Sequence, residues 1–249
     1  MKMVDPNEKV NEIVDPNFWL IEDLPSKYML YPKDTKISGK RLSVPEVKKL
    51  AQMNEDNYAS VIRFVLSNAI KGIDVDDILI ADKLYLIFWL RANTYREPGY
   101  DVEFKCNLCK NRSFYEFELD LLKVNYIVSN FNDIKIIPIQ SAETIEISYC
   151  NIKTFEAMKE IQKNNEKIDI ESLDLAANIK IGDLSLADRY KYLDTELSAE
   201  QYSKLNSYLK KYWIGIDDSV TIPCRLCGGQ AQVGVTFRRD FFIPEYKFE

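Results

Sequence analysis

The chain has 249 residues, of which 46% are hydrophobic and 29% charged, with a formal net charge of −6 and an isoelectric point near 5.0. An acidic chain offers no electrostatic attraction to nucleic acid or to anionic lipid headgroups. Histidine is absent, which excludes Ser-His and Cys-His catalytic pairs and every metal site that needs an imidazole.

The first residues are polar and charged, and Asp-Pro occurs twice among them. This composition predicts a flexible N-terminal arm over 1–17, followed by a single cooperative domain over 18–249. The polar opening does not match a secretory signal, and no apolar run is long enough to span a membrane. Phe18 and Trp19 open the domain, and they predict either an anchor on its own core or a docking element for a partner.

Helical patterns dominate two parts of the chain, 43–95 and 153–213. Ser43-Val-Pro-Glu46 and Ser198-Ala-Glu-Gln201 are capping boxes that predict helix starts. The segment after Lys83 is apolar on nearly all sides, which predicts a helix at the centre of a bundle.

An acidic group precedes that central helix, formed by Asp74, Asp76, Asp77 and Asp82. It lacks the glycine and the terminal glutamate of a calcium loop. We therefore expect these carboxylates to cap helix ends and to complement the helix dipole.

Two Cys-x-x-C pairs, Cys106/Cys109 and Cys224/Cys227, provide the most specific signal in the chain. Each lies between apolar/polar alternating segments, so each is expected at the tip of a hairpin, over 100–120 and 219–237. Two such knuckles complete a tetrahedral shell of four thiolates, which predicts one structural zinc per chain.

Two alternatives for these cysteines stay open, namely two unliganded thiol pairs and a thioredoxin-like redox pair. A redox Cys-x-x-C lies at the start of a helix, where the dipole lowers the pKa of the first thiol. Cys150 follows an apolar strand and is expected to be a buried thiol and not a ligand.

Alternating segments between 133 and 150 predict a small sheet. The predicted fold class is therefore α+β, mainly helical, with this sheet and a zinc-ribbon-like pair of hairpins. The tail after the second knuckle is aromatic and is expected to be extended. Its large aromatic side chains are candidate partner anchors together with Phe18 and Trp19; they are Phe241, Phe242 and Tyr246.

The order of several short motifs resembles that of a known family. Leu24-Pro25-Ser26 precedes Tyr31 and the segment 41–48 (Arg-Leu-Ser-Val-Pro-Glu-Val-Lys). Leu90-Arg-Ala-Asn-Thr-Tyr95 leads into the first knuckle, and Phe241-Phe-Ile-Pro244 follows the second. Over about residues 20–245, this order resembles the baseplate hub proteins of T-even-type contractile-tailed bacteriophages. In size the chain is most similar to the hub assembly protein.

The resemblance implies a non-enzymatic protein that helps to build the central hub of the baseplate in the cytoplasm of the infected host. Its partners would be other phage baseplate hub proteins, with no nucleic acid and no small-molecule substrate. Related proteins either stay in the virion tail or leave after assembly, and the residues do not separate these roles.

Two functions of other classes remain open on the residues alone. A zinc-ribbon nucleic-acid or transcription accessory protein is disfavoured by the acidic charge. A thiol oxidoreductase would need a thiol with a lowered pKa and a disulfide substrate.

Overall fold

The computed structural model describes residues 16–95, 99–118, 122–138, 144–165, 167–235, 237 and 239–244. Apart from residues 16 and 17, the predicted N-terminal arm lies outside this range, and so does Tyr246. Across the described parts of the chain, no helix combines the length and apolar character needed to cross a bilayer.

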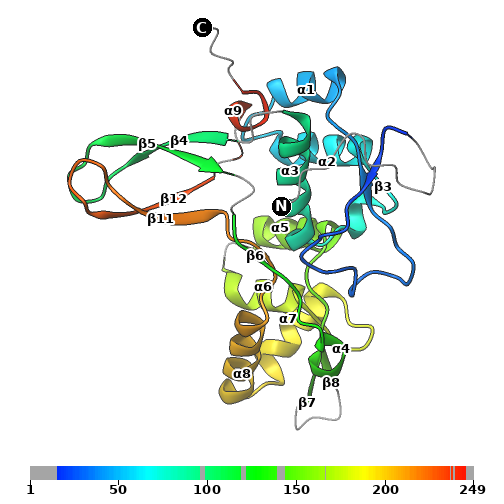
Figure 1. Cartoon of the computed structure of the whole chain (residues 1–249). Coiled ribbons are helices and arrows are strands. Elements are labelled where there is room, and N and C mark those ends of the chain that lie inside the picture. The colour runs from blue at the N-terminus through cyan, green and yellow to red at the C-terminus, as the bar shows by residue number, and fades with distance from the viewer. Residues whose placement is uncertain are drawn as a thin grey trace, which may run out of the picture.

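The chain combines helices with short strands that pair antiparallel, so the fold is α+β, as predicted (Figure 1). The helical elements are α1 (Val44–Ala51), α2 (Tyr58–Ala69), the 3-10 turn η1 (Val75–Asp77), α3 (Ile80–Thr94), α4 (Phe131–Ile134), α5 (Ile152–Asn164), α6 (Ile170–Ala177), α7 (Leu186–Thr195), α8 (Ala199–Lys211) and α9 (Arg239–Phe242). The strands are β1 (Trp19–Leu20), β2 (Ser38–Gly39), β3 (Ile70–Lys71), β4 (Gly99–Lys105), β5 (Arg112–Glu118), β6 (Val124–Asn125), β7 (Ile136–Pro138), β8 (Thr144–Ile147), β9 (Ile179–Lys180), β10 (Gly215–Ile216), β11 (Ser219–Pro223) and β12 (Gln230–Gly234).

The strands pair antiparallel in several small sheets, with the orders β1-β2-β3, β7-β8-β9, β10-β6, β4-β5 and β11-β12. The predicted sheet over 133–150 needs correction at both ends. Asp133 and Ile134 belong to the helical turn α4, and β9 joins the sheet from a segment beyond 150. The alternation of apolar residues could not reveal β9, because two residues are too few to show a period of two.

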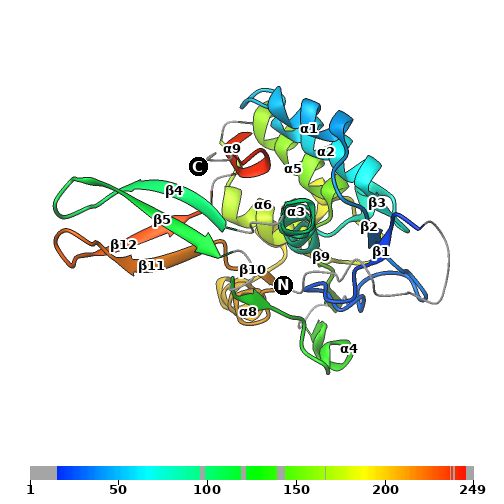
Figure 2. The same ribbon diagram turned by 45° about the horizontal axis from the view of Figure 1, so that its top comes forward.

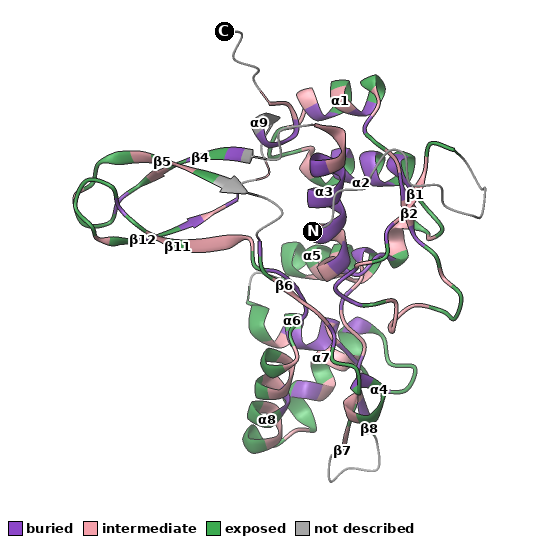
Figure 3. Cartoon of the chain, viewed as in Figure 1, coloured by how far each residue is buried: buried purple, intermediate pink, exposed green. Residues whose placement is uncertain are grey.

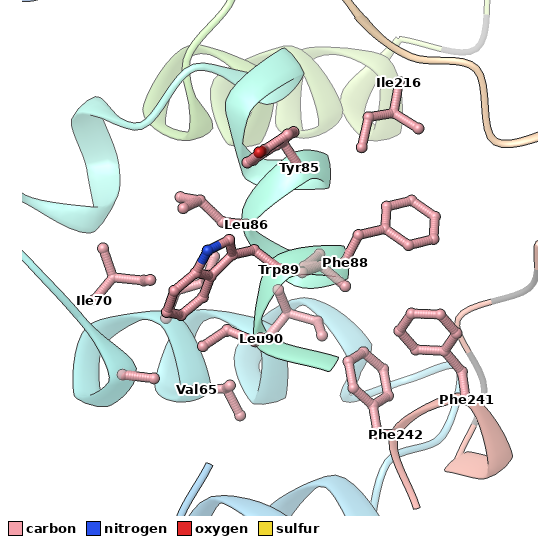
Figure 4. Close-up of a cluster of buried hydrophobic side chains, with 14 of the residues drawn as sticks. Val65, Ile70, Tyr85, Leu86, Phe88, Trp89, Leu90, Ile216, Phe241 and Phe242 are labelled. Atoms are coloured by element: carbon pink, nitrogen blue, oxygen red, sulfur yellow. The ribbon is translucent and has the colours of Figure 1, made fainter. Parts of the chain in front are cut away.

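Helix α3 lies at the centre of the helical body, with α1, α2, α5 and α9 around it (Figures 1 and 2). Every residue from Tyr85 to Ala92 is buried, which confirms the prediction of a helix that is apolar on nearly all sides. Figure 4 shows Trp89 and Phe88 pointing from α3 toward the elements that pack on it. A β-carbon at Gly39 would lie 2.6 Å from a ring carbon of Trp89, so the indole packs directly on strand β2.

Both predicted capping boxes are present. The Glu46 carboxylate accepts a hydrogen bond from Ser43 N at 2.7 Å, and Pro45 occupies the first turn of α1. At α8, Ser198 N donates to Gln201 Oε1 at 2.9 Å and Gln201 N donates to Ser198 Oγ at 3.3 Å. These local pairs specify where α1 and α8 begin.

The Leu24-Pro-Ser motif is fixed to α3 by a buried carboxylate. Asp82 is fully buried and accepts hydrogen bonds from Ser26 N at 3.0 Å and from the Tyr31 hydroxyl at 2.8 Å. The same hydroxyl accepts from Leu79 N at 3.1 Å. Burial raises the pKa of Asp82 above its ordinary value, although the contact with Ser26 lowers it. The predicted capping role is confirmed for Asp74, whose carboxylate accepts from Asp76 N at the start of η1.

A second cluster of buried side chains joins α5, α6, α7 and α8 to the sheet β7-β8-β9. Its fully buried members include Ile145 on β8, Ala176 on α6 and Ile179 on β9. Figure 1 places α6, α7 and α8 together on the side of the molecule away from α1 and α9. Whether 18–249 unfolds as one cooperative unit stays a prediction, because packing alone does not measure cooperativity.

Candidate metal centre

The hairpins β4–β5 and β11–β12 project together from the helical body (Figures 1 and 2). We call them the hairpin pair. Alternate side chains on β4 and β12 are buried, and Tyr100, Val102 and Val233 belong to the same core cluster as α3. The hairpin pair is therefore continuous with the core at its base and needs another source of stability at its tip.

The two knuckles have the same backbone hydrogen bonds. In the first, Cys106 N donates to Asn111 O at 3.0 Å and Lys110 N donates to Cys106 O at 3.0 Å. In the second, Cys224 N donates to Gly229 O at 2.8 Å and Gly228 N donates to Cys224 O at 2.8 Å. Each knuckle thus turns its two sulfur atoms to one side, in the same way.

The four sulfur atoms form one cluster. Cys106 Sγ lies 3.7 Å from Cys227 Sγ, and Cys109 Sγ lies 3.8 Å from Cys224 Sγ. All four sulfurs lie within 4.8 Å of one another, and all four are free thiols. A zinc ion with Zn–S bonds of about 2.3 Å places its sulfur ligands about 3.8 Å apart. The donor set and its spacing therefore fit a tetrahedral metal site, and such a site could hold a metal ion.

Backbone N–H groups favour the thiolate form in the first cysteine of each knuckle. The N–H groups of Cys109 and Leu108 lower the pKa of Cys106 to about 6. Those of Leu226 and Cys227 likewise lower the pKa of Cys224. The pKa of Cys227 is lowered by the Gly229 N–H but raised overall to about 11, because burial and the neighbouring sulfurs disfavour a further thiolate. All four cysteines can be thiolates at the same time only if a cation, such as a metal ion, offsets their negative charge.

The equivalent turn positions carry different residues, and this difference predicts a stability effect. Gly228 has φ +70° and Lys110 has φ +60°, a conformation that costs a side-chain-bearing residue about 1 kcal/mol or more. Because nothing lies within 4 Å of a β-carbon at Gly228, Gly228→Ala is expected to destabilise the chain by about 1 kcal/mol through backbone strain alone. Lys110→Gly is expected to stabilise it by up to about 1 kcal/mol.

Urea unfolding midpoints of the metal-loaded protein check both changes. Gly234→Ala on the same hairpin is the control, since its β-carbon would meet only ordinary contacts at 3.7 Å and 3.8 Å. An unchanged midpoint in Gly228→Ala would contradict the strain argument.

Comparison with known proteins gives the family. A family model described as T4 bacteriophage base plate protein matches residues 21–243. The chain belongs to this family. Among curated proteins and solved structures, no match to the chain was found. The family assignment gives this base plate protein a structural or assembly role in a phage baseplate, among other baseplate proteins.

All four clustered cysteines of this base plate protein lie within the matched residues, and so does the Ser26–Asp82 contact. Cys150 lies outside the cluster. It is buried, and burial raises the pKa of its thiol to about 12, in agreement with the prediction of a buried thiol.

The predicted aromatic anchors of the base plate protein divide into two groups. Phe18 and Trp19 are half-buried, with Lys71 Nζ 4.0 Å from the centroid of Phe18 and the Arg41 guanidinium 5.6 Å from that of Trp19. Trp19 also packs on the main core cluster. The other group requires a correction, because Phe241 and Phe242 are buried in that core (Figure 4).

The C-terminal segment that carries these two residues is the helical turn α9 and not extended chain. Phe241 packs edge-to-face on Phe88 and Tyr100, with ring centroids 5.6 Å and 5.2 Å apart. The rings therefore close the core beside α3 and present no surface to a partner. Composition alone could not separate core packing from docking on a partner, since aromatic side chains are common in both places.

Proposed function

We propose that this protein is a non-enzymatic morphogenesis factor for the central hub of the phage baseplate, acting through contacts with other hub proteins in the cytoplasm of the infected cell. The family match over residues 21–243 carries this proposal. The motif order described above supports the more specific assignment to the hub, because the chain resembles the hub proteins in the sequence and spacing of its motifs.

We further propose that the four clustered cysteines hold one structural zinc ion. A shell of four thiolates leaves no open position for water or substrate, so the metal would hold the two hairpins together and would not act on a substrate. The sulfur spacing of 3.7 Å and 3.8 Å supports this assignment. The metal would thereby connect chain segments that lie 115 to 121 residues apart in sequence.

The thiol oxidoreductase alternative has less support. Both Cys-x-x-C pairs lie in hairpin turns after β4 and β11 and not at the start of a helix, where thioredoxin-like redox pairs lie. Sulfur atoms of different knuckles also lie only 3.7 Å and 3.8 Å apart, so the two pairs form one cluster. This pairing favours a shared metal over two separate redox pairs.

Complementation of a phage that lacks this gene tests the proposed function. Without the protein, infected cells are expected to accumulate incomplete baseplates without hubs, and supply of the wild-type chain from a plasmid is expected to restore infectious particles. Electron microscopy and plaque counts give the readout. Normal hubs in the absence of the protein would refute the proposal.

Mass spectrometry of purified virions against infected-cell lysate then separates a retained subunit from an assembly factor that leaves.

A further inference from the structure

The tip of the hairpin pair exposes two leucines at equivalent positions. Leu108 and Leu226 both occupy the third position of a Cys-x-Leu-Cys knuckle, and they are 71% and 65% exposed. Both flank the same cluster of sulfur atoms. We define the hairpin tip as residues 105–112 and 223–230, and Figure 3 shows mostly exposed residues at this end of the hairpins, far from the helical body.

Covering the sulfur atoms explains only part of why leucines occupy these two positions. Leu108 lies across the second knuckle, since its Cδ1 is 2.3 Å from where a β-carbon of Gly229 would be. Gly229 therefore lets the leucine approach the backbone there. Most of the Leu108 side chain nevertheless faces solvent, and a leucine that served only as a cover would have its apolar surface buried.

The charge of the tip differs in sign from that of the rest of the chain. The tip carries four basic residues and no acidic residue, although the chain as a whole has 33 basic and 39 acidic residues. All four side chains are exposed, and they are Lys105, Lys110, Arg112 and Arg225. A zinc ion with four thiolates carries a double negative charge, so the tip would stay positive when the metal is bound.

We propose that the hairpin tip docks on an acidic surface of another baseplate protein, with Leu108 and Leu226 as its apolar contacts and the basic side chains around them as its charge contacts. The proposal rests on the proposed function, since it names the surface through which hub assembly acts. Opposite charges at the rim of an interface steer and orient the two proteins.

Several observations favour a protein over a nucleic acid at this site. Proteins that bind single strands stack bases on aromatic side chains, and the tip residues include no aromatic residue. Aliphatic leucines instead suit an apolar depression on a protein. Contact between the tips of two copies of this chain is disfavoured because the tip of each copy is basic, and a photo-crosslink distinguishes docking on the body of a second copy.

The test uses the complementation assay with two tip variants. One combines Leu108→Ser with Leu226→Ser, and the other combines Lys110→Glu with Arg225→Glu. The leucine variant is expected to keep the metal content and the unfolding midpoint of the wild type. The charge-reversed variant places two carboxylates beside the thiolates, so it is expected to keep the metal but to unfold at a somewhat lower midpoint. Both are expected to lower the yield of infectious particles about ten-fold or more. Matched controls on α1 are Val44→Ser, at a valine that is 66% exposed, and the pair Lys48→Glu with Lys49→Glu. The controls are expected to retain the wild-type yield.

A photo-crosslinking amino acid at position 108 or 226 identifies the occupant in infected cells. The expected product joins the tip to an acidic peptide of another phage baseplate protein, and the charge-reversed variant loses it. Wild-type yield from both tip variants would overturn the proposal. A crosslink that forms only to a second copy of this chain would also overturn it. The same holds if the wild type is retained on single-stranded DNA and the charge-reversed variant is not. If the wild-type chain itself proved dispensable for the hub, the proposed function would fail as well; if only the tip were dispensable, the function would stand.

Discussion

Cys106→Ser is expected to leave the protein insoluble or unfolded, and Cys227→Ser to do the same. A structural zinc site contributes on the order of 10 kcal/mol of apparent binding energy, which is comparable to the whole free energy of unfolding of a typical domain. The two knuckles bring together cysteines that lie 115 to 121 residues apart in the sequence. Loss of one ligand would therefore release the tips of both hairpins, whose bases form part of the core around α3.

Soluble yield, metal content and circular dichroism measure this effect. The matched control is Cys150→Ser, because Cys150 is a buried thiol outside the cluster. The control is expected to keep one zinc per chain, and the wild-type chain is expected to lose its fold when a chelator removes the metal. A soluble, folded Cys106→Ser protein without metal would show that the hairpin pair is stable without the proposed zinc.

Those parts of the structure that depend on local sequence could be predicted. The capping boxes at Ser43 and Ser198 specify helix starts through contacts three residues apart, and both are present. Burial around α3 follows from apolar residues on all of its faces. The cysteine cluster was predictable because a shared metal imposes its own geometry on two knuckles, wherever they lie in the chain.

The parts that depend on distant partners could not be predicted in the same way. Asp82 has the sequence context of a helix-start carboxylate, and only the fold reveals that it binds Ser26 and Tyr31. An aromatic C-terminal segment can pack in the core or contact a partner, and which of these occurs depends on whether its side chains can pack against α3. The leucines at the hairpin tip had a signal in the sequence, namely the same residue at the same knuckle position, but their exposure became visible only in the structure.

Phe241→Ala is expected to destabilise the protein by about 3–5 kcal/mol, the usual cost of removing a phenylalanine side chain from a packed core. The side chain is 0% exposed, and its ring lies 5.1 Å from the ring of Phe237 and 4.8 Å from that of Phe242. Its neighbours belong to α3 and β4 as well, so the cavity would lie where the C-terminal segment, the central helix and the hairpin pair meet.

Phe114→Ala is the matched control, because the same residue type is 64% exposed on β5. Urea unfolding is expected to show a large drop in midpoint for Phe241→Ala and almost none for Phe114→Ala. Loss of complementation by Phe241→Ala would then follow from the unfolded fraction and is expected to diminish at lower temperature, as the folded population recovers. An unchanged midpoint combined with a complete loss of hub assembly would instead show that Phe241 contacts a partner, and the placement of α9 against α3 would have to be abandoned.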